Sequence, residues 1–224
     1  MIKLIGVLIV IVGFALNLNN IAIILVAGFV TGLVGGMDLI KILETIGGSF
    51  VANRGMAIFI IIMLVTGTLE RNGLREMAAK LIAKIKNATA GMVIAAYGVL
   101  RLILAAFNVS LGGTAGFVRP VVMPMAIGAV EAKHGQANEK HVEELKGMSS
   151  GMENTTWFFG QVLFIGGGGA LLVQSTLKNL GYETDLAELA KVEVPVAIFA
   201  LIVASIIYYL KDRHLDKTLY NQNQ

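Results

Sequence analysis

The chain has 224 residues, of which 56% are hydrophobic and only 15% are charged, and its mean hydropathy is +0.75. A soluble domain carries about a quarter charged residues, so this composition indicates an integral membrane protein. The absence of cysteine excludes disulfides and thiolate metal sites, and a net charge of +3 gives no indication of a nucleic-acid partner. The three histidines, His134, His141 and His214, fall in charged stretches, so we expect them to be solvated.

Seven apolar runs are continuous rather than alternating, which favours helices over a β-barrel. Most are shorter than the roughly 20 residues that cross a bilayer. We therefore expect an all-α integral membrane protein with short transmembrane helices, the first of them retained rather than cleaved as a signal peptide. In chain order the runs are 2–16, 21–36, 56–69, 91–107, 115–130, 154–177 and 194–210.

The segments between these runs have their own patterns. Residues 17–20 form a tight turn between the first two helices. Apolar residues at helical spacing in 74–85, with lysines off that stripe, predict a helix that lies along the membrane surface. The stretch 38–53 shows the same pattern less clearly.

Basic residues concentrate in the stretches 70–87, 131–153 and 211–217, which the positive-inside rule places on the cytoplasmic side together with the C-terminus. The runs 91–107 and 115–130 lie between the first two of these stretches. Either two full crossings or a re-entrant hairpin satisfies this topology.

The stretch that joins these two runs, residues 108–119, reads NVSLGGTAGFVR and is rich in glycine. Pro120 fits best at the first position of a helix, which predicts a second arm from Pro120 to about Lys133, roughly 20 Å long. Pro124 leaves the carbonyl of Pro120 free. Such backbone at membrane depth binds ligands in transporters, but an ordinary extramembrane loop explains the composition equally well.

A second polar interruption follows at 149–161, SSGMENTTWFFGQ. Asn154, Thr155 and Thr156 enter an apolar run there, as a break in a helix or as helix N-caps. Four consecutive glycines, Gly166 to Gly169, interrupt the same run and indicate either a discontinuous helix or close helix packing.

Two arginines lie within apolar segments, where each needs a partner. Arg119 ends the glycine-rich linker and could bind a substrate carboxylate or pair with Glu153 or free carbonyls. We rate Arg101, within the first arm, lower as a ligand. Glu153 could carry a proton.

The stretches NVSLGGTAGFVRPVVMPMA and GMENTTWFFGQVLFIGGGGALL resemble the small subunit of the two-component bacterial pyroglutamate transporters, nearly end to end. The resemblance implies a multi-pass protein of the bacterial inner membrane and a larger membrane subunit, encoded nearby, as partner. It also implies a loose relation to the ion-transporter superfamily of carboxylate carriers, whose re-entrant hairpins clamp sodium and substrate. A higher oligomer is compatible with it, because carriers need two repeats and this chain holds no clear duplicate.

By that likeness, the hairpin tip and the helix break bind the substrate, and a coupling sodium ion binds near Asn108, Gly113, Asn154 and Thr155. The sequence departs from the family's Ser-Asn-Thr pattern at both places. We expect three parts: N-terminal transmembrane helices with the interfacial helix as a scaffold (1–88), a transport-site half with the re-entrant hairpin and the broken helix (89–177), and an extracytoplasmic loop, the last transmembrane helix and a cytoplasmic tail (178–224). The substrate residues are Asn108, Ser110, Gly112, Gly113, Thr114, Arg119, Asn154, Thr155 and Thr156.

The sequence supports two functional hypotheses. One is a subunit of a secondary transporter that moves a small organic anion, pyroglutamate first, with sodium or protons. The alternative is a structural or assembly subunit without a substrate site of its own. An intramembrane enzyme is disfavoured, because the apolar segments hold no pattern of paired catalytic or metal-binding residues.

Overall fold

A computed structural model describes residues 4–52, 58–85 and 87–220, and the secondary structure of these residues is helical. The chain divides into two compact units, Met1–Ala57 and Ile58–Gln224. The outermost parts of the predicted segments 2–16, 38–53 and 56–69, at positions 2–3, 53 and 56–57, lie outside the described residues.

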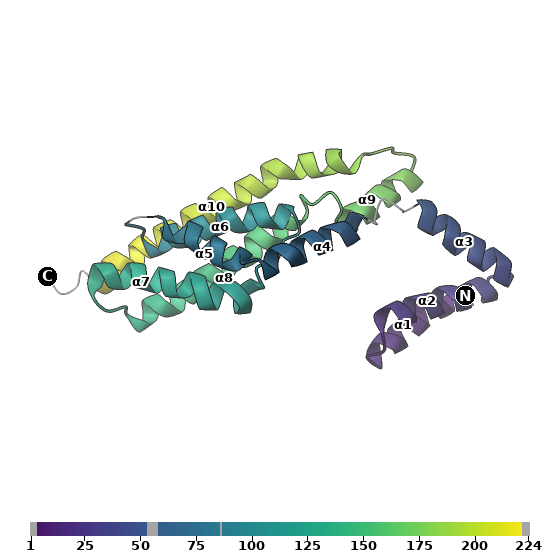
Figure 1. The fold of residues 1–224 in the computed structure, drawn as a ribbon, viewed down its shortest axis with the longest axis horizontal. Coiled ribbons are helices and arrows are strands. Elements are labelled where there is room, and N and C mark those ends of the chain that lie inside the picture. Colours follow the sequence, from purple (N-terminus) through teal and green to yellow (C-terminus); the bar gives the residue numbers. More distant parts are fainter. Residues whose placement is uncertain (1–3, 53–57, 86, 221–224) are drawn as a thin grey trace. The chain divides into compact units, whose positions relative to one another are not determined.

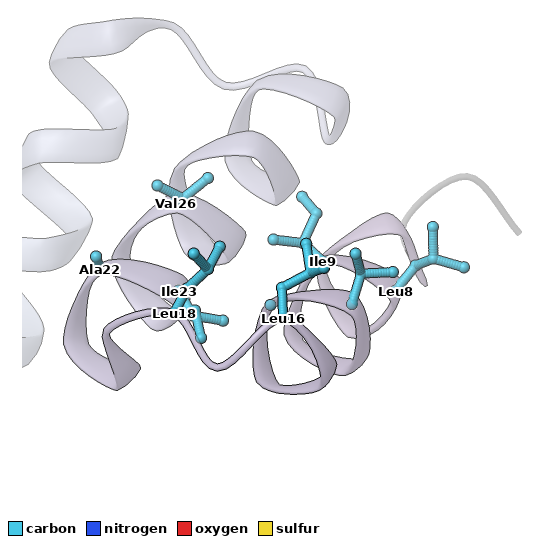
Figure 2. Close-up of a pocket in the computed structure, with 9 residues that line it drawn as sticks. Leu8, Ile9, Leu16, Leu18, Ala22, Ile23 and Val26 are labelled. Atoms are coloured by element: carbon cyan, nitrogen blue, oxygen red, sulfur yellow. The ribbon is translucent and has the colours of Figure 1, made fainter.

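The first unit is a helical hairpin followed by a third helix, with α1 at Ile5–Ala15, α2 at Asn20–Val34 and α3 at Leu39–Ala52. The predicted turn is confirmed: Asn17 adopts a left-handed conformation (φ 54°), and the Asn19 side chain caps α2 by accepting a hydrogen bond from the Ile21 amide at 3.0 Å. An apolar pocket of about 340 Å³ lies between α1 and α2, and Figure 2 shows the leucine and isoleucine side chains that line it.

The second unit carries the remaining described helices. In Figure 1, α10 runs alongside α6, and α6, α8 and α10 pack against one another. The elements are α4 (Ile58–Arg71), α5 (Leu74–Ala83), α6 (Ala90–Ala106), the π-helix η3 (Thr114–Val122), α7 (Met123–His134), α8 (Glu139–Gln161), α9 (Gly168–Asn179) and α10 (Leu186–Tyr220).

Small residues let these three helices approach closely. A methyl group added at Gly91 of α6 would lie 2.8 Å from the Cα of Tyr209 in α10. A methyl group at Gly160 of α8 would lie 2.5 Å from the Cβ of Ala105 in α6. Both distances are below van der Waals contact, so neither position tolerates a side chain without movement of a helix.

Two of the described helices are long and apolar enough to cross a membrane by length and composition, Thr114–His134 and Leu186–Tyr220. Three shorter ones, α1, α2 and α6, are also apolar. These helices indicate association with a membrane. The predicted start of the second arm is wrong: the helix begins at Thr114 and Pro120 lies inside it, so this arm has 21 residues and is not unusually short.

The predicted helix break at Asn154–Thr156 is also wrong. Helix α8 runs without interruption from Glu139 to Gln161, so none of these three residues caps or breaks a helix. The chain leaves helical structure only after Gln161, and α9 begins at Gly168, inside the run of four glycines. The apolar run 154–177 did not reveal where α8 starts, because the first part of the helix is polar. The run begins fifteen residues after Glu139, the first residue of α8.

Hydrogen bonds and ion pairs join the C-terminal end of α10 to the first turns of α6 and α8 and to the last turn of α7. Asp212 accepts hydrogen bonds from the backbone N–H of Gly91 at 2.8 Å and pairs with His141 at 3.0 Å, with both side chains buried. Asp216 pairs with His134 at 2.9 Å and with Lys133. The Tyr220 ring stacks on the His134 ring, with centroids 3.9 Å apart, and its hydroxyl accepts a hydrogen bond from Asn138.

These contacts correct the expectation of solvated histidines. His141 is fully buried and His134 is largely buried, and only His214 is exposed.

Asp216 lies beyond the apolar run 194–210. Burial raises the pKa of its carboxyl group, but hydrogen bonds from Lys133 and His134 outweigh burial and hold that pKa below its usual range.

Candidate functional site

In the structure the linker is shorter than predicted: it consists of residues 107–113, between the end of α6 and the start of η3, and contacts inside the protein hold it in place. Asn108, Gly112 and Gly113 all adopt positive φ, at 55°, 90° and 62°. Val109 and Leu111 are buried, whereas Ser110 is exposed and its hydroxyl accepts a hydrogen bond from the Gly112 amide at 3.1 Å. The alternation turns the apolar side chains into the bundle and the polar ones outward. Glycine adopts positive φ at little cost and asparagine tolerates it, which explains the residue types at Asn108, Gly112 and Gly113.

A buried polar cluster holds the linker against α6 and α8. The Arg101 guanidinium donates from Nε to Glu153 Oε2 at 2.8 Å and from Nη1 to the carbonyl of Val109 at 3.1 Å. Its Cζ atom lies 4.3 Å from the centroid of the Trp157 ring, a cation–π contact. The Tyr97 hydroxyl also donates to Glu153 Oε2. Arg101 and Glu153 are 1% and 5% exposed, so they form an interior ion pair. This confirms the prediction that Arg101, an arginine in an apolar segment, has a partner.

Only one carboxylate oxygen of Glu153 takes part in these contacts. The other, Oε1, has no hydrogen-bond partner among the described residues and faces the linker, 3.7 Å from where a methyl group on Gly113 would lie. The predicted pairing of Arg119 with Glu153 is wrong: Glu153 forms its ion pair with Arg101, and no ion pair joins it to Arg119.

The linker also contacts α5. A methyl group added at Gly112 would lie 3.1 Å from Arg75 Nη2, and one at Gly116 would lie 4.0 Å from Arg75 Nη1. The Arg75 guanidinium thus lies along the glycine backbone where the π-helix begins.

Arg119 lies at a different place, on an open pocket of about 410 Å³ that η3, α7 and α8 form together. Arg119 is exposed and forms no ion pair with a described residue. The second cation of the pocket, Lys146, pairs with Glu143 on its own helix. The lining residues are Thr114, Val118, Arg119, Met123, Pro124, Ile127, Lys146 and Ser150.

This lining has the chemistry of a site for a small anion. Arg119 offers a planar guanidinium that can hold a carboxylate by two hydrogen bonds. Thr114 and Ser150 each offer a hydroxyl that can donate or accept. Val118, Met123 and Ile127 supply an apolar wall. A few polar groups over an apolar wall are typical of small-molecule pockets.

Of the predicted substrate residues, the structure brings Thr114 and Arg119 together in this pocket. Asn108, Ser110, Gly112 and Gly113 form the linker that precedes it. Asn154, Thr155 and Thr156 are not among the residues that line the pocket. Asn154 is exposed, Thr155 is half-buried, and Thr156 is buried with its hydroxyl donating to the Met152 carbonyl at 2.7 Å.

Lys146 and Ser150 were not predicted from the sequence. Their signal is the spacing Lys146, Ser150, Asn154: residues four apart lie on one face of a helix, so this face presents one polar group per turn. The signal becomes readable once α8 is known to begin at Glu139. By the same spacing Asn154 continues the face that lines the pocket by one further turn.

Fold and site together define an all-helical protein with membrane-length helices and a cationic pocket beside a glycine-rich linker. The chain belongs to the family described as "Protein of unknown function (DUF969)", which matches residues 1–216. Comparisons with curated proteins and with solved structures gave no match. The family description names no substrate, so the resemblance to pyroglutamate transporters stays a prediction.

Proposed function

We propose that the chain is a multi-pass inner-membrane subunit of a secondary active transporter that moves a small organic anion, with pyroglutamate as the first substrate to test. The observation that carries the proposal is the pocket where Arg119, Lys146, Thr114 and Ser150 meet. In this proposal the C-terminus is cytoplasmic and a larger membrane subunit completes the transport path.

The charges of the pocket suit a monoanion. Lys146 already has a carboxylate partner in Glu143, so Arg119 supplies the uncompensated positive charge. A substrate carboxylate would pair with Arg119, and the two hydroxyls would bind an amide or carbonyl group on a small ring. Pyroglutamate has one carboxylate, one ring amide and an apolar edge, which matches these donors and the wall of Val118 and Ile127.

The pocket lies on the second arm of the hairpin that α6 and η3–α7 form. Its linker exposes backbone at Ser110 and Gly112, and the buried Arg101–Glu153 pair holds the linker in position. Transporters use such irregular backbone where it lines a cavity within the membrane. In the proposal the hairpin is re-entrant. Helices α8 and α9, with the non-helical residues between them, then form one discontinuous membrane helix.

The coupling ion is part of the same proposal. Glu153 Oε1 is a carboxylate oxygen that could act as a sodium ligand, and it has no hydrogen-bond partner among the described residues. It lies beside Gly113 of the predicted sodium site. Asn108 lies in the same linker, whereas Asn154 and Thr155 lie on α8 next to Glu153 in sequence. Replacement of sodium by potassium in the uptake assay, and separately collapse of the proton gradient, identify the ion.

The decisive experiment is uptake of labelled pyroglutamate into vesicles that contain this chain and its partner. Arg119→Gln removes a charge-assisted contact worth about 1.5–3 kcal/mol, so we expect the apparent affinity constant to rise about tenfold to hundredfold. Arg119→Lys should recover part of the affinity. Arg213→Gln, at an exposed arginine of α10 that stacks on Tyr209, is the matched control and should leave uptake unchanged.

Two results would contradict the transport proposal. Undiminished uptake by vesicles without this chain would exclude it from the transport path. An unchanged affinity in Arg119→Gln, with the complex still assembled, would favour the alternative of a structural subunit whose partner holds the whole site.

A further inference from the structure

Helix α5 has two apolar sides, of which the bundle covers only one. Ala78 and Ile82, one turn apart, are 2% and 3% exposed and belong to the core that also contains Phe117 and Val118 of η3. This packing fixes the orientation of α5 on the second unit.

The other side of α5 is exposed in the second unit. Met77 and Leu81, also one turn apart, are 56% and 47% exposed. Lys80 and Lys84 follow at the same four-residue spacing, are exposed, and form no ion pair with a described residue. Residues four apart lie on one helix face, so an apolar strip borders directly on a basic strip.

We propose that this outer face, formed by Met77, Lys80 and Leu81 of α5 and by its C-cap residue Lys84, binds the head groups of anionic phospholipids at the membrane surface. Met77 and Leu81 enter the boundary between head groups and acyl chains, which is where apolar side chains of interfacial helices lie. Lys80 and Lys84 extend over them, with their methylene stems on the apolar strip and their ammonium groups at lipid phosphates. The charge complementarity of two unpaired lysines with a phosphodiester selects an anionic lipid over a zwitterionic one.

The lipid site has a structural connection to the anion pocket. Arg75, on another side of α5, lies along Gly112 and Gly116, at the start of the helix that carries Thr114 and Arg119. Lipid that holds α5 in place therefore supports the linker and the pocket. This second part rests on the proposed function, whereas lipid binding itself does not.

The test uses the full chain purified in a zwitterionic detergent and titrated with short-chain phosphatidylglycerol or phosphatidylcholine, with bound lipid counted by native mass spectrometry. We expect tighter binding of phosphatidylglycerol. Because each lysine near a membrane surface contributes about 1 kcal/mol, Lys80→Gln with Lys84→Gln should weaken phosphatidylglycerol binding about 30-fold. The matched control, Lys178→Gln with Lys191→Gln on α9 and α10, should leave it unchanged.

Further variants keep the proposal falsifiable. Met77→Ser with Leu81→Ser should weaken binding of both lipids, and circular dichroism should show unchanged helix content. Equal affinity for the two lipids, or an unchanged affinity in the Lys80/Lys84 variant, would overturn the proposal. Loss of a co-purifying protein in that variant, with lipid binding intact, would also overturn it and assign the face to a protein partner. In vesicles, loss of phosphatidylglycerol dependence while Arg119→Gln still impairs uptake would separate a failure of the lipid site from a failure of the transport proposal.

Discussion

At the scale of single residues, the two arginines of the apolar segments have opposite environments. Arg101 is enclosed by Glu153, the Val109 carbonyl and the Trp157 ring, so its charge is neutralised inside the protein. Arg119 is exposed on a pocket. A buried charge with a complete set of partners serves structure, whereas an exposed guanidinium over an open pocket is free to bind an anion. This contrast is the reason we propose a structural role for Arg101 and ligand binding for Arg119.

The first prediction concerns the buried pair. Glu153→Ala leaves the Arg101 charge uncompensated in the interior, so we expect a loss of about 3–5 kcal/mol in the free energy of unfolding. Replacing both partners by apolar residues, Arg101→Met with Glu153→Leu, should recover most of that loss because no lone charge remains. Chemical unfolding in detergent measures both. The control Glu143→Ala, at an exposed pair with Lys146, should change stability by less than about 0.5 kcal/mol. A double variant no more stable than Glu153→Ala would contradict this explanation.

The sequence predicts part of this residue-scale picture. The need of an arginine in an apolar segment for a partner follows from the cost of a charge there, and Arg101 has one in Glu153. The partner itself depends on how α6 and α8 are rotated against each other, and that rotation follows from close contacts such as Gly160 on Ala105. Such contacts involve residues more than fifty positions apart, so sequence spacing alone assigned Glu153 to the wrong arginine.

At the scale of elements, the π-helix is the feature that places Arg119. In η3 the Met123 amide donates to the Val118 carbonyl five residues back, not four, and Pro120 lies inside this wide turn. In a regular α-helix Pro120 would lack its hydrogen bond and its ring would clash with the carbonyl of Gly116. The wider turn relieves that clash, and π-helical turns occur often at functional sites.

The second prediction tests this geometry. Pro120→Ala permits η3 to tighten to an α-helix, which would rotate Arg119 relative to α8. We expect at least about a tenfold loss of pyroglutamate affinity, equal to about 1.4 kcal/mol, with the melting temperature unchanged or higher. Pro195→Ala, at the proline inside α10, is the control and should leave affinity unchanged. Full affinity in Pro120→Ala would show that the pocket does not depend on the π-helix.

The third prediction concerns helix packing. A methyl group at Gly91 would meet the backbone of α10, at Tyr209 Cα (2.8 Å) and the Tyr208 carbonyl (3.2 Å), and backbone atoms cannot move aside by a change of rotamer. Gly91→Ala should therefore cost about 1–3 kcal/mol of stability. Gly147→Ala in α8, where nothing lies within 4 Å of the added methyl group, should stabilise by up to about 1 kcal/mol. Thermal unfolding of the two variants side by side measures the difference, and equal melting temperatures would contradict it.

Most elements were predictable because apolar runs mark them: 21–36 corresponds to α2, and 91–107 to α6, within two residues at each end. Two boundaries were not. Helix η3 starts at Thr114, six residues before Pro120, because a π-helical turn accommodates a proline that we expected at the first position of a helix. The start of α8 was missed because its first half is polar. Its buried stripe, His141, Leu145, Met148 and Met152, nevertheless has helical spacing and is the signal that locates it.

At the scale of the whole second unit, the cytoplasmic end proposed for the bundle is closed by α10. Asp212 holds the first turn of α6 through the Gly91 amide and α8 through His141, and Asp216 holds the end of α7 through His134. Tyr220 covers both histidines, with centroids 3.9 and 5.8 Å away. One helix end thus fixes three others, so we expect the bundle to depend on residues far from the pocket.

The last prediction follows from the Asp216 carboxyl group. Its folded-state pKa is held below the usual value of about 3.9 by Lys133 and His134 despite burial, so folding favours the ionised form. A group whose pKa is lowered on folding contributes stability that is complete above its unfolded pKa and is lost as the pH falls through the folded pKa. We therefore expect the stability of the native chain to fall as the pH drops below about 4, and Asp216→Asn to flatten that dependence while lowering stability at neutral pH. Asp185→Asn, at an exposed aspartate before α10, is the control and should leave the slope unchanged. Melting temperatures in detergent between neutral and acidic pH measure the slope, and an identical slope in Asp216→Asn would mean that this ion pair does not fasten α10 to α7.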